Sequence, residues 1–145
     1  MHPVLRNILA IIVGFLAGSA INMGFIMIGG SVVPPPPGSD VNTMEGMQRA
    51  MLLFEPKHFL FPFLAHALGT LAGAAGAAWF AASRKLEMAM VVGALFLAGG
   101  VAAVMMLPSP VWFSALDLIG AYIPMAYLGW KLATYKQGSA ALQPG

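Results

Sequence analysis

Four long apolar segments, separated by short polar or proline-containing stretches, dominate the sequence. They cover approximately residues 8–29, 58–82, 88–107 and 111–131. A helix needs roughly 20 apolar residues to cross the hydrocarbon core of a bilayer, so each segment is long enough to be a transmembrane span. The pattern therefore predicts an all-α integral membrane four-helix bundle, built as a single transmembrane domain over residues 1–136. Residues 137–145 are small and mostly polar, and we expect them to form a flexible cytoplasmic tail.

The long connection between the first two spans, residues 30–57, carries a helix signal of its own. A run of prolines followed by Gly38 predicts a short extended rod and a turn. Asn42 and Glu45 have the spacing of a capping box, with Asn42 as the N-cap, and predict an external amphipathic helix that ends near Phe54. We expect this helix to lie flat on the membrane or to cap the bundle.

The composition supports a membrane protein, because 59% of the residues are hydrophobic and only 8% are charged. A soluble domain typically carries about 25% charged residues, so the expected partner is the lipid bilayer. The seven Lys and Arg residues are too few for a surface that tracks phosphates, and no nucleic-acid partner is expected. The sequence has no cysteine, which excludes disulfides, thiolate metal sites and cysteine nucleophiles.

The basic residues are distributed unevenly between the two ends of the spans. Arg49 and Lys57 fall on one side of the predicted topology, and the other five fall on the opposite side: Arg6, Arg84, Lys85, Lys131 and Lys136. Short cytoplasmic loops carry the excess of positive charge, so we expect a bacterial inner-membrane protein with both termini in the cytoplasm. The first apolar run continues well past Ser19, which favours a retained span over a cleaved signal peptide.

Three polar side chains fall within the spans: Asn22, His66 and Asp117. With a rise of about 1.5 Å per residue, they lie roughly 9–13 Å below the external ends of three different helices. An ionisable residue at this depth is costly and is a functional hypothesis by default. Pro124 predicts a bend in the fourth span, one turn beyond Gly120. We therefore predict a polar cluster in the outer half of the bundle.

Further polar residues on the second span extend this predicted cluster. Thr70 shares a helix face with His66, and the same face continues outward through His58 to Glu55. The candidate binding site for a solute or an ion therefore combines residues of three spans and the external loop. It consists of Asn22, His66, Thr70, Asp117, Glu55 and His58.

Glycines at four-residue spacing mark the close-packing faces of two spans. Gly14 and Gly18 form one small-xxx-small pair, and Gly69 with Gly73 forms another. Such pairs let helix backbones approach one another in lipid. We expect these faces to hold the helices together, and they could equally hold a second copy of the chain in a homo-oligomer.

The favoured function is binding or passage of a small solute or ion, with proton linkage through histidine and aspartate. A non-catalytic subunit of a larger membrane complex is the second hypothesis, because glycine-faced spans with few charges suit an assembly partner. No cofactor is expected. An enzyme is not favoured, although Glu55-x-x-His58 followed by His66 leaves a metal-dependent membrane hydrolase open.

A third hypothesis is handling of Cu(I). Thioethers suit this ion, and several methionines fall on the external side. The strongest candidates are Met23, Met27, Met44 and Met47. No dense methionine run is present, and methionine is also an ordinary gap-filler in apolar packing.

The segment from Leu53 to Phe59, together with the stretch from Phe61 to Thr70, resembles a group of small bacterial four-span membrane proteins. The resemblance extends through most of the chain except the tail. It implies the four-span fold and a bacterial inner membrane. It carries over no functional residue.

Overall fold

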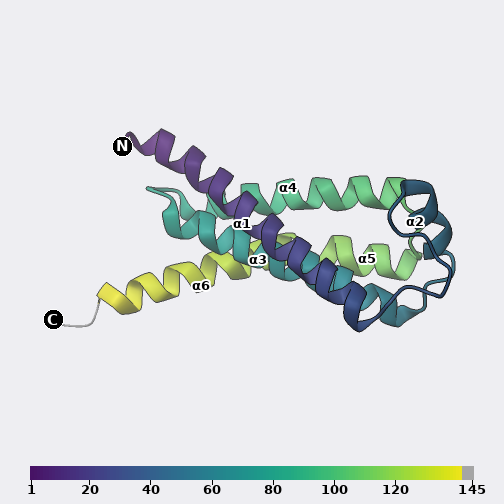
Figure 1. Cartoon of the computed structure of the whole chain (residues 1–145). Helices are drawn as coiled ribbons and strands as arrows, with labels where there is room; N and C mark the ends of the chain where they lie inside the picture. The colour runs from purple at the N-terminus through teal and green to yellow at the C-terminus, as the bar shows by residue number, and fades with distance from the viewer. Residues whose placement is uncertain (142–145) are drawn as a thin grey trace.

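The computed structural model describes residues 1–141, and this part of the chain is all-helical, without a β-strand (Figure 1). The elements are α1 (Pro3–Val32), α2 (Met44–Met51), the 3₁₀-helix η1 (Pro56–Phe59), α3 (Leu60–Phe80), α4 (Lys85–Met106), α5 (Val111–Gly120) and α6 (Ile123–Ala141). Four stretches are long and apolar enough to cross a membrane: α1, η1 with α3, α4, and α5 with α6. The predicted all-α class and the approximate positions of four apolar helical stretches are therefore confirmed.

Helix α3 lies at the centre of the structure, and α1, α4 and α6 all pack against it. Helix α1 crosses α3 diagonally, while α5 and α6 follow one another along the opposite side (Figure 1). The N-terminus and the far end of α6 lie at one end of the molecule, and α2 lies at the other (Figure 1).

The crossing of α1 over α3 depends on the four predicted glycines. A Cβ added to Gly14 would lie 2.5 Å from the carbonyl oxygen of Gly73, and one added to Gly18 would lie 2.5 Å from that of Gly69. The two glycine faces are therefore packed against each other within one chain. They are not available to a second copy, so the expected use of these faces in a homo-oligomer is wrong.

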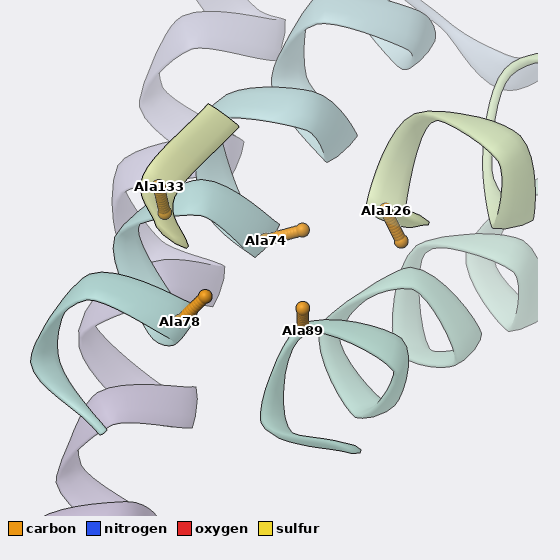
Figure 2. Close-up of a cluster of buried hydrophobic side chains, with 5 residues drawn as sticks. All are labelled: Ala74, Ala78, Ala89, Ala126 and Ala133. Carbon is orange, nitrogen blue, oxygen red and sulfur yellow. The ribbon is translucent and has the colours of Figure 1, made fainter. Parts of the chain in front are cut away.

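Alanines fill the space where α3, α4 and α6 meet. The buried cluster consists of Ala74, Ala78, Ala89, Ala126 and Ala133 (Figure 2). Because each side chain is a single methyl group, the three helix backbones come close together. Small residues at helix interfaces give this kind of packing where lipid supplies no hydrophobic drive for association.

Helix α2 begins one residue later than predicted. Its N-cap is Thr43, whose hydroxyl oxygen accepts a hydrogen bond of 3.0 Å from the Gly46 amide. The backbone amide of Asn42 instead donates a hydrogen bond to the Asp40 carboxylate. The same carboxylate accepts a 2.7 Å hydrogen bond from the Thr43 hydroxyl. These hydrogen bonds, the larger effect coming from Thr43 and the smaller from the Asn42 backbone amide, hold the pKa of Asp40 below its ordinary value. The helix ends at Met51, about a turn before the predicted end.

Helix α2 caps one end of the long helices. Met51 is buried in a cluster with Phe59 and Phe113, which come from the start of the second span and from α5. Gln48 donates a 2.8 Å hydrogen bond to the carbonyl of Met106, at the end of α4. Of the two predicted positions for this helix, the structure shows the cap.

The connection between α3 and α4 is held by the first turns of α1. Arg6 donates through Nε to the carbonyl of Phe80 at 2.8 Å, and the Asn7 side-chain oxygen accepts from the amide of Ala82 at 2.9 Å. These bonds satisfy backbone groups that the end of a helix leaves without partners. The interaction adds a structural role for Arg6 to the topological role predicted from its charge.

Helix α6 extends further than expected, into the predicted tail. It is helical to Ala141, and within it Gln137 accepts a 2.6 Å hydrogen bond from Lys85 and donates to the carbonyl of Trp79 at 3.2 Å. Residues 137–141, the expected beginning of the tail, are thus helical, while the flexibility of the tail stays a prediction. The rest of that tail, residues 142–145, lies outside the described residues.

We predict that Gly14→Ala lowers the free energy of unfolding relative to Gly24→Ala by about 1–3 kcal/mol, the usual cost of overpacking. Both substitutions add the same methyl group to α1, so the gain in helix propensity cancels. Only the Gly14 methyl would press on backbone atoms of α3, since nothing lies within 4 Å of a Cβ at Gly24. Unfolding in mixed micelles measures the difference. Equal free energies of unfolding for the two variants would contradict the close contact of α1 with α3 at Gly14.

Candidate functional site

The fourth apolar stretch is interrupted in its middle. Helix α5 ends at Gly120 and α6 begins at Ile123, with Ala121 and Tyr122 in the link. Pro124 lacks an N–H, and its ring clashes with the carbonyl of the residue four positions earlier, Gly120. The predicted bend is thus present as a break between two helices. It leaves Ala121 and Tyr122 buried, with at most 1% of their surface exposed.

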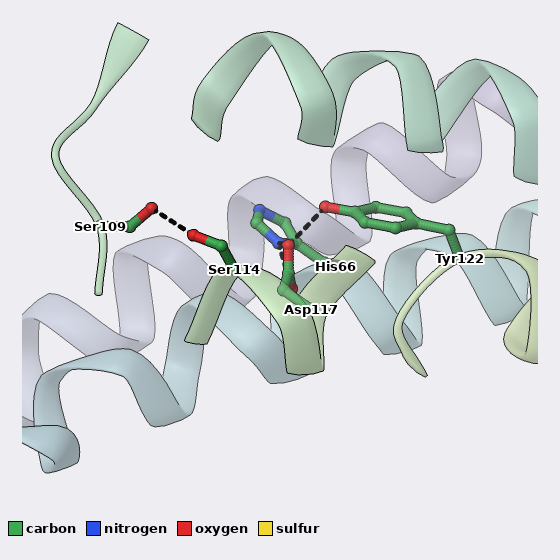
Figure 3. A network of polar contacts seen from close by, with 5 residues as sticks. All are labelled: His66, Ser109, Ser114, Asp117 and Tyr122. Atoms are coloured by element: carbon green, nitrogen blue, oxygen red, sulfur yellow. Dashed lines mark hydrogen bonds and ion pairs between the residues drawn. The ribbon is translucent and has the colours of Figure 1, made fainter. Parts of the chain in front are cut away.

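The break brings three polar side chains together. Asp117, in the last turns of α5, is only 2% exposed, and its carboxylate oxygens lie 2.8 and 3.0 Å from Nδ1 of His66 on α3. The hydroxyl of Tyr122 donates a 2.8 Å hydrogen bond to Oδ2 of the same carboxylate (Figure 3). The imidazole also stacks on the Tyr122 ring, with 5.7 Å between centroids. We call these three residues the His66–Asp117–Tyr122 network.

The carboxylate determines the tautomer of His66. An ionised carboxylate only accepts hydrogen bonds, so whenever Asp117 is ionised the proton in the 2.8 Å contact belongs to Nδ1 of the imidazole. The second nitrogen, Nε2, points away from Asp117 (Figure 3). It therefore remains able to accept a hydrogen bond, or to take up a proton and donate one. Two donors stabilise the Asp117 charge, which compensates for part of its desolvation.

Two members of the network, His66 and Asp117, line a cavity of about 370 Å³. This volume lies within the range of roughly 300–1,000 Å³ typical of small-molecule sites. The cavity is enclosed by the ends of α1 and α4, the start of the second span, α5 and α2. Its lining is mainly apolar and includes Ile26, Val33, Met47, Phe59, Val104 and Phe113. The ionisable side chains among the described lining residues are His58, His66 and Asp117.

Tyr122 was missed by the sequence prediction. Its hydroxyl occupies space that Gly100 of α4 leaves open, because a Cβ at Gly100 would collide with the hydroxyl oxygen. The only signal in the sequence is its place two residues before Pro124, where a break turns the chain. Spacing on a continuous helix would have put Tyr122 on a different face from Asp117.

Two members of the predicted cluster do not join the network. Asn22 packs its Cβ against Gly69 at the crossing of α1 over α3. Thr70 is fully buried. The side-chain oxygens of both are buried without a hydrogen-bond partner. The expected four-residue cluster is therefore replaced by the pair of His66 and Asp117 joined by a tyrosine.

Glu55 and His58, the two external residues of the predicted site, have different roles in the structure. The backbone amide of Glu55 donates a 2.9 Å hydrogen bond to Nδ1 of His58. This bond is part of a capping box at the start of η1. The Glu55 carboxylate is exposed and forms an ion pair of 3.1 Å with Lys57. His58 lines the cavity, whereas Glu55 does not. The Glu-x-x-His spacing thus has a structural explanation.

The residues considered as metal ligands lie in different surroundings. Among the described residues, no three His, Asp or Glu side chains lie close enough to hold a metal ion. Of the four methionines considered for Cu(I), Met47 lines the cavity, while Met23, Met27 and Met44 are about half exposed or more.

Comparisons with models of known protein families, with curated protein sequences and with solved structures found no match. Any role of the cavity is therefore inferred from the residues that line it. The resemblance to small bacterial four-span proteins stays a prediction.

We predict that Tyr122→Phe lowers the free energy of unfolding by about 1–3 kcal/mol, because a buried carboxylate loses a donor. Tyr127→Phe is the matched control, since Tyr127 is 41% exposed and its ring contacts with Trp130 and Lys131 survive the change. Unfolding of both variants in mixed micelles gives the comparison. If Tyr122→Phe and Tyr127→Phe lower the free energy of unfolding equally, the Tyr122 hydrogen bond does not stabilise Asp117.

Proposed function

We propose that the protein is a four-span bundle in a bacterial inner membrane, with both termini in the cytoplasm. The long apolar helices expose large hydrophobic side chains along their length, such as Ile12, Leu16 and Met27 on α1. The N-terminus and the far end of α6 lie at the same end of the molecule, opposite α2 (Figure 1). The excess of basic residues favours the cytoplasm for that end.

The absence of cysteine makes the topology simple to test. We predict that a membrane-impermeant thiol reagent labels Asn42→Cys in intact spheroplasts, because the α2 end faces outward. Ala82→Cys, in the exposed turn between α3 and α4, should be labelled only after the membrane is permeabilised. The opposite pattern would invert the orientation, and labelling of both positions in sealed spheroplasts would contradict four spans.

Within this bundle, the cavity binds a small solute, and a proton on His66 controls the binding. The observation that carries this proposal is a buried carboxylate paired with an imidazole in the wall of a cavity that is otherwise mainly apolar. A charged residue inside a membrane costs about 2.5–3.5 kcal/mol on insertion scales, and interhelical hydrogen bonds return only about 0.6 kcal/mol each. A carboxylate placed here at this cost favours a use beyond packing.

The proton acts through the second nitrogen of His66. When the imidazole is neutral, Nε2 accepts a hydrogen bond from a solute, and when it is protonated, Nε2 donates one. The titratable groups that face this imidazole are Asp117 and Tyr122, with His58 further along the cavity. The described residues that α1, α2 and α4 contribute to the lining are uncharged. Solute affinity therefore depends on whether His66 carries this second proton, and hence on pH.

The fluorescent amine aminoanthracene tests this function, because it combines an apolar body with one hydrogen-bond donor. We predict that its affinity for the protein in nanodiscs falls as the pH is lowered from 8 to 5, as Nε2 loses its lone pair. Asp117→Asn should weaken binding at pH 8 by about tenfold or more and remove the pH dependence, since the carboxylate no longer holds the tautomer.

Glu87→Gln is the control for loss of a carboxylate, because Glu87 is exposed and pairs with Arg84 at the opposite end of α4. It should bind the probe as the wild type does, and empty nanodiscs give the background. A merely structural role of the network would instead give probe binding that is independent of pH and unchanged in Asp117→Asn.

A further inference from the structure

The charge balance of the cavity selects the kind of solute. Asp117 supplies a buried negative charge, and the described lining contains no lysine or arginine. With a neutral His66, the site therefore carries one uncompensated negative charge in surroundings of low dielectric constant. An anionic solute would add a second negative charge, whereas a cationic solute would neutralise the first. Such interactions are several times stronger at an effective dielectric constant near 20 than in water.

The position of the cavity indicates how a solute reaches it. In one half of the structure, Phe15 of α1 packs on Phe96 of α4, with 5.0 Å between ring centroids. Toward the α2 end, α1 and α4 diverge (Figure 1), and the cavity is lined by residues of both helices. Helix α2 covers that end of the molecule through its cluster with Phe59 and Phe113. A solute that comes from the side of the bundle would pass between α1 and α4, whose residues line the cavity.

A glycine lies on this lateral approach. Gly30 of α1 lines the cavity and is exposed, and a Cβ added to it would meet no atom within 4 Å. Gly29 beside it is different, because a Cβ there would press on the ring of Phe61. Gly30 thus combines a place in the cavity lining with free space for a side chain.

From these observations we propose that the cavity binds a membrane-soluble amine, an apolar molecule with one amino group, that enters from the lipid between α1 and α4. The proposal rests on the function proposed above and adds the class of solute and its route. The ammonium form donates a hydrogen bond to Nε2 of His66, and its charge compensates Asp117. A proton on His66 occupies the same acceptor, so amine binding and protonation of His66 exclude each other.

Three compounds with the same tail and different head groups test the solute class: octylammonium, octanol and octanoate. Each competes with aminoanthracene for the protein in nanodiscs at pH 8, with empty nanodiscs as the correction for partitioning. Octylammonium should displace the probe at a concentration at least tenfold lower than octanol, and octanoate should be weaker than octanol. Equal or better displacement by octanoate would overturn the proposed class, even if the pH-dependent binding of aminoanthracene itself is confirmed.

Two substitutions on α1 test the route. Gly30→Phe should weaken octylammonium binding by at least tenfold, because the ring fills the lateral approach. Gly24→Phe adds the same ring to the same helix at a position that also has open space but does not line the cavity, and it should bind as the wild type does. Matching thermal unfolding of the two variants controls for folding. Unchanged binding in Gly30→Phe would rule out the route between α1 and α4.

Discussion

The need to stabilise one buried carboxylate governs the arrangement of the structure around its polar centre. Asp117 is almost completely buried in a protein with five acidic residues in all. Its carboxylate receives hydrogen bonds from an imidazole and a phenol that lie on different elements. The tyrosine reaches it only because the chain breaks before Pro124, and the hydroxyl fits only because residue 100 is a glycine. The break between α5 and α6 and the glycine on α4 therefore both allow the hydrogen bond to Asp117.

The packing of small residues explains why a cavity exists at one end. Glycines bring α1 against α3, and alanines bring α4 and α6 against the same helix. Straight helices that cross closely at one level must separate at another, and α1 and α4 diverge toward α2. The space between them is filled in part by α2 and its aromatic neighbours. What remains is a mainly apolar cavity with His66 and Asp117 of the network in its wall.

Much of this arrangement could be predicted from the sequence, because it depends on period and composition. Runs of apolar residues predicted the positions of the long helices, and glycine spacing predicted which faces pack closely. The pairing of His66 with Asp117 followed from their similar depth. Spacing on a helix, however, gives a face and not the neighbour that covers it. Asn22 was therefore placed in the cluster, although its face meets Gly69.

The features that were missed depend on local geometry. Tyr122 becomes a partner of Asp117 only through the exact turn of the broken helix. Thr43 and not Asn42 is the N-cap, and the Asp40 carboxylate holds the Thr43 hydroxyl and the Asn42 backbone amide in place. Arg6 caps α3 across a distance in sequence of more than 70 residues, which no local pattern encodes. Each of these contacts needs the tertiary arrangement before it can be recognised.

Solid-state nitrogen NMR of His66 in lipid bilayers tests the central claim most directly, because it reports which ring nitrogen carries a proton. The His66–Asp117–Tyr122 network requires a proton on Nδ1 at every pH at which the carboxylate is ionised, with Nε2 losing its own proton as the pH rises. Substitution of Asp117 by asparagine should release this preference. A neutral imidazole protonated on Nε2, with a bare Nδ1 facing Asp117, would contradict the account.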